Sequence, residues 1–200
     1  MKVHLRYNAP VVLTFALLCA VVLLIDQLTG GLFFIKTFFV LPAFFNSHSP
    51  LDWLRLFTYV IGHANWNHLI SNFSFILLIG PVLEEKYGSL PLLAMMVVTA
   101  LATAILNMVL VHTGLYGASG IVFMLILLSS FTNIRQGEIP ITFILIVALY
   151  LVREFVNALT PSTVSQLAHI AGGIIGGLFG FLFSKTPAVP TLPAQPGKKE

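Results

Sequence analysis

Six apolar runs separated by short polar breaks decide what this chain can fold into. They cover residues 11–25, 68–83, 90–111, 119–132, 139–152 and 166–183. Hydrophobic residues make up 58% of the 200 residues and charged residues only 8%, whereas a soluble domain carries roughly a quarter charged residues. Because about 20 apolar residues cross a bilayer as a helix, the pattern predicts an all-α membrane protein, a bundle of six transmembrane helices.

This bundle is expected to take up almost the whole chain. Residues 1–184 are predicted to form one membrane domain, and residues 185–200, which are rich in Pro and Lys, a disordered cytoplasmic tail. Several runs are shorter than a full span. Some helices should therefore begin or end inside the membrane, where protein or water must satisfy their free backbone groups.

The first run has two readings. Lys2 and Arg6 precede it, which suits a transmembrane helix and also the positive start of a signal peptide. A cleavage site should follow such a peptide, and only the weak Thr29-Gly30-Gly31 is present. The sequence therefore favours a first span that is retained.

Residues 30–66, between the first and second runs, mix aromatic and polar side chains. The aromatic members are Phe33, Phe34, Phe38, Phe39, Phe44 and Phe45, and among the residues that break them up are Lys36, Pro42, Pro50, Asp52 and Arg55. Rings beside polar groups favour the headgroup zone of a membrane. We expect a long interfacial first loop with short helices that lie partly in the membrane.

The basic residues predict the orientation of the bundle. Six spans place both termini on one side, and a cytoplasmic start puts seven basic residues inside: Lys2, Arg6, Lys86, Arg135, Lys185, Lys198 and Lys199. Only Lys36, Arg55 and Arg153 fall outside, which agrees with the positive-inside rule. The minimal layout suggests a bacterial plasma membrane. The net charge of +3 is spread singly, which predicts no nucleic-acid partner, and the single Cys19 permits no disulfide within the chain.

Polar residues inside apolar runs are costly, so each needs a reason. Four places qualify: His68 with Asn72; Gly117-Ala118-Ser119-Gly120; Ala168-His169 followed by Gly172 and Gly176; and Glu84 in the turn after the second run. Taken singly, each has an ordinary reading. Histidine, serine and asparagine bond between helices, glycines pack helices closely, and an acidic turn is solvated.

Together these residues match the needs of acyl transfer. Ser119 at a helix start lies beside free backbone N–H groups and the positive end of the helix dipole. Gly117 and Gly120 permit a tight turn and a close neighbour. Glycines at 172 and 176 share a face with His169, so a partner helix can come close enough for this base to reach the serine. His68 and Asn72, four residues apart on one face, can donate to a developing oxyanion. No acidic residue lies near His169 in sequence, which favours a Ser-His dyad.

The same residues resemble the rhomboid family of intramembrane serine proteases. The order of elements is similar: a long first loop, His68-x-x-x-Asn72 in the second run, Gly117-x-Ser119-Gly120 opening the fourth, and Ala168-His169 with a glycine face in the sixth. The resemblance extends from about Trp53 to Phe183, and the fifth run matches by position only.

The resemblance implies roles for particular residues. It makes Ser119 the nucleophile, His169 the general base, and His68 and Asn72 the oxyanion-stabilising side chains, helped by the Ser119 backbone N–H. Arg55, Glu84 and Gly88 are implied to be structural. It also implies transmembrane protein substrates, an active site open to the extracytoplasmic side, no cofactor and no metal.

Two residues depart from the family pattern. Leu54 separates Trp53 from Arg55, which are often adjacent in the family, and Phe123 stands where a tyrosine often follows the nucleophile. A phenyl ring can still stack on the His169 imidazole. Two other functions stay open at this point: a catalytically silent rhomboid-like binding protein, and a small transporter, although the two halves of the chain share no repeated motif.

The route of water and substrate gives two further expectations. Polar residues near the start of the second run, His63, Asn65, Asn67, His68 and Asn72, are predicted to line a wet cavity open to the outside. The run at 139–152 carries no glycine and no polar motif. We expect it to be a loosely packed gate for substrate.

Overall fold

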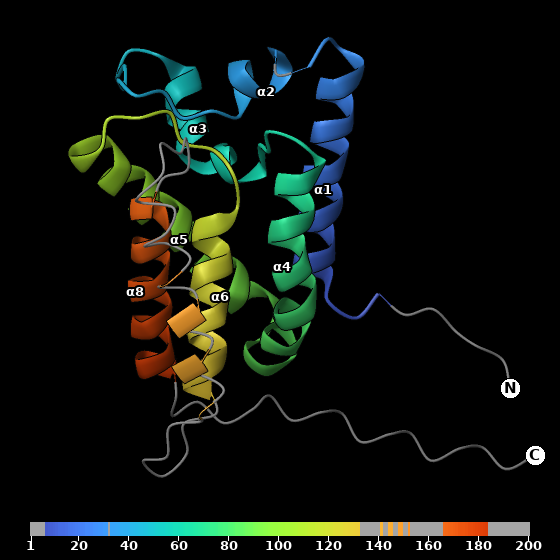
Figure 1. Cartoon of the computed structure of the whole chain (residues 1–200), viewed down its shortest axis with the longest axis vertical. Coiled ribbons are helices and arrows are strands. Elements are labelled where there is room, and N and C mark those ends of the chain that lie inside the picture. The colour runs from blue at the N-terminus through green and yellow to red at the C-terminus, as the bar shows by residue number, and fades with distance from the viewer. Residues whose placement is uncertain are drawn as a thin grey trace, which may run out of the picture.

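The computed structural model describes residues 7–31, 33–132 and 166–183, together with residues 141, 144, 145, 148, 149 and 152. Its helices, shown in Figure 1, are α1 (Pro10–Leu28), α2 (Phe33–Phe38), α3 (Pro50–Thr58), the 3-10 helix η1 (Tyr59–Ile61), α4 (Trp66–Tyr87), α5 (Ser89–Leu110), α6 (Ser119–Thr132) and α8 (Gln166–Phe183). The predicted tail, the end of the membrane domain at residue 184 and most of the predicted fifth run lie outside the described residues.

The all-helical class is confirmed for the part of the chain that is described. Three helices, α1, α4 and α5, are long and apolar enough to cross a membrane, and 119–130 and 169–183 form shorter apolar helical segments. Helices α6 and α8 have the bounds predicted from the sequence. The six-span count stays a prediction.

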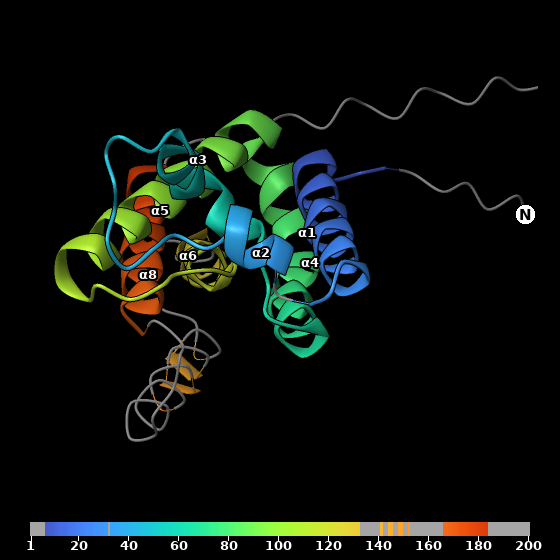
Figure 2. The ribbon, with the colours of Figure 1, turned by 90° about the horizontal axis from the view of Figure 1, so that it is seen from above.

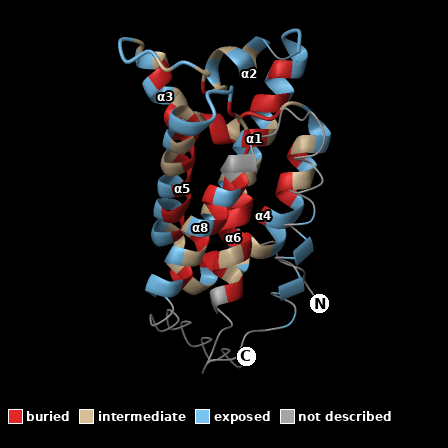
Figure 3. Cartoon of the chain, turned by 60° about the vertical axis from the view of Figure 1, so that its left-hand side comes forward, coloured by how far each residue is buried: buried red, intermediate tan, exposed pale blue. Residues whose placement is uncertain are grey.

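Helix α6 lies at the centre of the bundle. It contacts α4, α5 and α8 (Figure 2), and all six residues from 121 to 126 are buried. Figure 3 shows the same burial along most of its length. The sequence explains this position, because a helix that is apolar on all sides is stable only when other helices or lipid surround it. Any side chain at the start of α6 is therefore held by a rigid element.

The N-terminus of α1 is joined to α4 by Glu84. The buried Glu84 carboxylate accepts hydrogen bonds from the backbone N–H groups of Val11 at 2.9 Å and Val12 at 3.0 Å, and the Ser89 hydroxyl donates to it at 2.7 Å. A carboxylate there satisfies free N–H groups and complements the helix dipole. One turn earlier, a Cβ on Gly80 would lie 2.8 Å from Val12 Cγ2, so the glycine lets the two helices approach.

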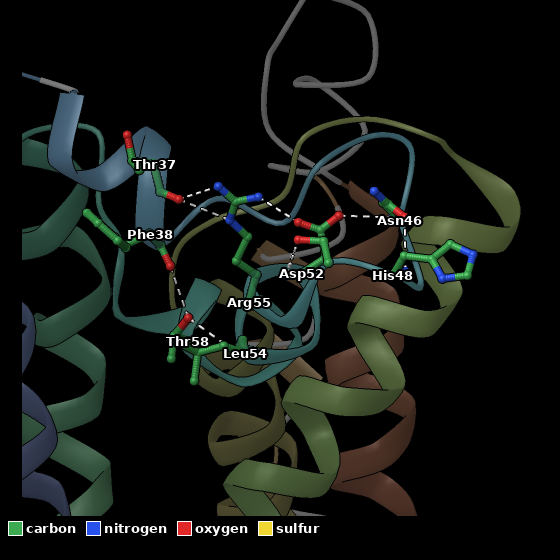
Figure 4. Close-up of polar contacts among 9 residues, drawn as sticks. Thr37, Phe38, Asn46, His48, Asp52, Leu54, Arg55 and Thr58 are labelled. Atoms are coloured by element: carbon green, nitrogen blue, oxygen red, sulfur yellow. Dashed lines mark hydrogen bonds and ion pairs between the residues drawn. The ribbon is translucent and has the colours of Figure 1, made fainter.

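A second polar cluster holds the segment between α1 and α4. Arg55 of α3 forms an ion pair with Asp52, with 2.7 Å between Nη1 and Oδ1, and its Nε and Nη2 donate to the Thr37 carbonyl (Figure 4). The other Asp52 oxygen accepts from the Asn46 backbone N–H at 3.0 Å. Arg55 and Asp52 therefore connect the end of α2, the following loop and α3.

The Glu84 cap gives a test of how α1 is held. We expect Glu84→Ala to lower the free energy of unfolding by about 2–3 kcal/mol, because two backbone N–H groups lose a charged acceptor. Thermal unfolding in detergent micelles measures the effect. Glu85→Ala, at an exposed neighbour, is the control and should change little; equal melting temperatures for the two variants would contradict the capping role.

Candidate active site

Ser119 is the first residue of α6. The Ala118 carbonyl accepts the first helical hydrogen bond, from the Val122 N–H at 3.0 Å, so Ala118 is the N-cap. The first N–H groups of a helix have no partner within the helix, and the dipole makes this end positive. Ser119 is half-buried. This end of α6 can therefore stabilise a negative charge beside the serine hydroxyl.

Backbone contacts with the first loop hold the segment that leads to Ser119. Leu41 and Leu115 pair as an isolated antiparallel bridge, with N–H to carbonyl distances of 2.9 and 3.0 Å. Two residues on, the Gly117 N–H donates to the Tyr59 carbonyl at 2.9 Å, and the Tyr59 hydroxyl donates to the Ala100 carbonyl of α5 at 3.1 Å. Sequence reasoning missed Leu41 and Tyr59, because contacts made by the backbone leave no residue signature.

Gly117 brings this segment against α4. Its φ of +107° is a conformation that favours glycine, and a Cβ there would lie 2.7 and 2.8 Å from Cε1 and Nε2 of His68. The same Cβ would be 3.9 Å from Asn72 Nδ2. His68 and Asn72, predicted to share one helix face, thus both lie beside the residue two positions before Ser119.

His169 of α8 lies beside the first turns of α6. Its ring stacks on Phe123, with 4.8 Å between the ring centroids and 9° between the ring planes. The sequence allowed this stacking, and the structure shows it. Phe123 follows Ser119 by four residues, so the two side chains share one face of α6. His169 as a whole is only 6% exposed, and its ring packs on a residue one helical turn after Ser119.

Two glycines allow α8 to lie this close to α6. A Cβ on Gly172 would overlap the backbone carbonyl of Gly120, and a Cβ on Gly176 would overlap that of Met124. Lipid tails are as apolar as leucine side chains, so close packing is what holds helices together in a membrane. The glycine face predicted for the last run therefore packs directly on the helix that begins with Ser119.

His63 is the partner of Asn72. Their side chains meet with 3.1 Å between His63 Nε2 and Asn72 Nδ2, and His63 Nδ1 lies 3.0 Å from the Ile61 carbonyl. Burial, together with the nearby His68, lowers the pKa of His63 to about 4. The expectation that His63 lines an open wet cavity is wrong, because its side chain is 0% exposed. Asn65 instead caps α4 by accepting from the His68 N–H at 2.9 Å.

The structure thus brings together the four residues predicted for catalysis and oxyanion stabilisation, and it places three of the predicted structural residues elsewhere. Ser119, His169, His68 and Asn72 surround the start of α6. Arg55 and Glu84 bond to backbone groups elsewhere, and Gly88, with φ of +88°, joins α4 to α5. In the described ranges, no group of three or more His, Cys, Asp or Glu side chains is placed to hold a metal ion. The predicted gate at 139–152 lies mostly outside the described residues.

A family model of the Rhomboid domain matches residues 50–186, which is more than half of the chain. The chain belongs to the rhomboid family, as its motifs predicted. Together with the long apolar helices, this match makes the chain an integral membrane protein.

Two relatives show how far the similarity extends. The rhomboid protease GlpG of Haemophilus influenzae is 26% identical over 190 residues, which cover 92% of this chain and 96% of the relative. Rhomboid-like protein 11, chloroplastic, of Arabidopsis thaliana is 27% identical over 157 residues, or 70% of this chain. That alignment spans 56% of the plant protein.

The packing of α8 on α6 can be tested with two neighbouring glycines. Gly172→Ala should push the helices apart and lower stability by about 1–3 kcal/mol, as overpacking typically does. Gly173→Ala is the matched control, because its Cβ would lie 3.6 Å from Leu127 and Phe123, an ordinary contact. Melting temperatures in detergent should fall for the first variant only, and a similar fall in both would contradict this account.

Proposed function

We propose that this protein is an intramembrane serine endopeptidase that cleaves membrane proteins with a dyad of Ser119 and His169. One observation carries the proposal most directly. The His169 ring is stacked on Phe123, one helical turn after a serine that begins the same central helix. A serine and a histidine base are the minimum needed for nucleophilic acyl transfer.

In the first half of the reaction, Ser119 Oγ attacks the carbonyl carbon of the scissile peptide and its proton passes to His169. The carbonyl oxygen becomes an oxyanion. Donors for this charge come from His68, Asn72 and the free N–H groups at the start of α6. His169 then gives its proton to the leaving amine, the C–N bond breaks, and an acyl-enzyme remains on Ser119.

In the second half, His169 takes a proton from water, whose oxygen attacks the acyl carbon. The same donors stabilise the second oxyanion, and the Ser119 oxygen leaves with the proton returned from His169. Every proton transfer in this scheme uses His169, and no step needs a metal or a cofactor.

The substrate we propose is a transmembrane segment of another protein, unwound near its end so that an extended peptide reaches Ser119. Family membership and the position of the serine among apolar helices support this class. We also propose that both termini face the cytoplasm and that the active site opens to the other side, with residues 30–66 at that interface. The distribution of Lys and Arg supports this orientation.

A catalytically silent relative would keep the fold and lack a reactive serine. Covalent labelling of the purified protein by a fluorophosphonate probe distinguishes an active protease from such a silent binding protein. Such a probe modifies a serine activated by a base. Labelling at Ser119 supports the protease, and a folded wild-type protein that takes up no probe points to the silent binder.

Replacing either member of the dyad should abolish proteolysis. Ser119→Ala and His169→Ala each remove a group that takes part in every step, whereas both leave the glycine contacts of α8 in place. Cleavage of a model transmembrane substrate in liposomes provides the measurement, and thermal unfolding checks the fold. Near wild-type cleavage by either folded variant would remove that residue from the dyad.

The oxyanion donors should have smaller effects. His68→Ala and Asn72→Ala are each expected to lower kcat by about 10² to 10³, the usual cost of one such donor, and by less where water takes its place. The KM for the same substrate should change little, because the charge develops only in the transition state. Unchanged kcat in both single variants and in the double variant would exclude them from the site.

A further inference from the structure

His63 has no part in the mechanism above, yet it is enclosed at the centre of the site. It lies between η1 and α4, and its side chain is 0% exposed. The ring of His68 lies at 5.0 Å between centroids and that of Phe73 at 5.9 Å. A fully buried imidazole needs a partner for each ring nitrogen, so its hydrogen bonds define its state.

The partner of Nδ1 fixes the tautomer of His63. Nδ1 lies 3.0 Å from the Ile61 backbone carbonyl, and a carbonyl oxygen can only accept a hydrogen bond. Nδ1 must therefore carry the proton. The pKa of His63, lowered to about 4 by burial and by His68, keeps the ring neutral at ordinary pH. A neutral imidazole has one N–H, which leaves Nε2 as an acceptor.

The tautomer of His63 in turn determines the orientation of the Asn72 side-chain amide. Because Nε2 accepts, the Asn72 atom 3.1 Å away must be the donor Nδ2 and not the carbonyl oxygen. An amide nitrogen carries two hydrogens, and His63 takes one. The nitrogen also lies beside the loop that leads to Ser119, since a Cβ on Gly117 would be 3.9 Å from it. The second N–H is thus left for the reaction site.

We propose that His63 is a positioning residue, which orients the Asn72 amide so that an N–H, and not the carbonyl oxygen, faces the oxyanion. The reversed amide would present a lone pair to the developing negative charge. Two hydrogen bonds run in the same direction: the Asn72 amide donates to His63 Nε2, and His63 Nδ1–H donates to the Ile61 carbonyl. This role deepens the proposed protease function and rests on it.

Two variants separate the hydrogen bond from the bulk of the ring. His63→Phe keeps an aromatic ring beside His68 and Phe73 but accepts nothing from Asn72. It should lower kcat by roughly tenfold to a hundredfold with little change in KM, because a misplacement of about 1 Å can cost about 10²-fold. His63→Gln can offer an oxygen near the place of Nε2, so it should recover much of the loss. Equal losses in two folded variants would overturn the acceptor role.

A double-mutant cycle tests whether His63 acts through Asn72. If it does, His63→Phe combined with Asn72→Ala should have the kcat of Asn72→Ala alone, within about twofold. The control cycle replaces His63→Phe with Glu84→Gln, which loosens the far end of α4 without touching Asn72. The fold loss in kcat of the double variant Glu84→Gln/Asn72→Ala should equal the product of the fold losses of the two single variants. If the His63→Phe/Asn72→Ala variant also showed the product of its two single losses, the proposal would be overturned.

A third measurement is independent of catalysis. Ring ¹⁵N chemical shifts of histidine distinguish the two tautomers, and His63 in the purified protein should carry its proton on Nδ1. Its Nε2 resonance should shift in Asn72→Ala. A proton on Nε2 would overturn the positioning role whether or not the protein is a protease. Absence of cleavage and of probe labelling by the wild-type protein would instead overturn the proposed function.

Discussion

Close contact between α6 and α8 is the constraint on which the rest of the site depends. In a membrane, apolar side chains gain little by leaving lipid for protein, so two helices stay together only where their surfaces fit. Here the backbone of α8 at Gly172 touches the backbone of α6 at Gly120. That contact lies one turn below His169 and next to Ser119. The separation of His169 and Ser119 is therefore set by two residues without side chains.

The buried polar groups divide by charge. Near the start of α6, the buried His63 and Asn72 bond to each other, and the half-buried His68 lies beside them and accepts from the Ala64 backbone N–H. The buried carboxylates lie toward the ends of helices: Glu84 accepts from the start of α1, and Asp26 accepts from the Ile35 N–H of α2 at 2.9 Å. A buried charge is costly unless it has donors, and helix starts provide them. Uncharged groups such as His63 and Asn72 can instead satisfy one another.

The sequence predicted what depends on side-chain type and missed what depends on the backbone. The bounds of α6 and α8 follow from the length of the apolar runs, and the stacking of Phe123 on His169 was allowed by the resemblance to the rhomboid family. The burial of His63 could not be predicted, since a polar residue just before a helix is usually exposed to solvent. Its partner, Asn72, is nine residues away, on neither helical nor strand spacing.

The pairing of Leu41 with Leu115 and the bond from Gly117 to the Tyr59 carbonyl have an evolutionary consequence. Both anchors are made by peptide groups, which every residue except proline supplies in full. The side chains at 41 and 115 are therefore free to change as far as packing permits, whereas the Tyr59 hydroxyl also bonds to the Ala100 carbonyl. The number of residues between 115 and 117 cannot change, because an inserted residue would shift one backbone contact relative to the other so that both could not form together. Homologues should vary here by substitution and keep the spacing unchanged.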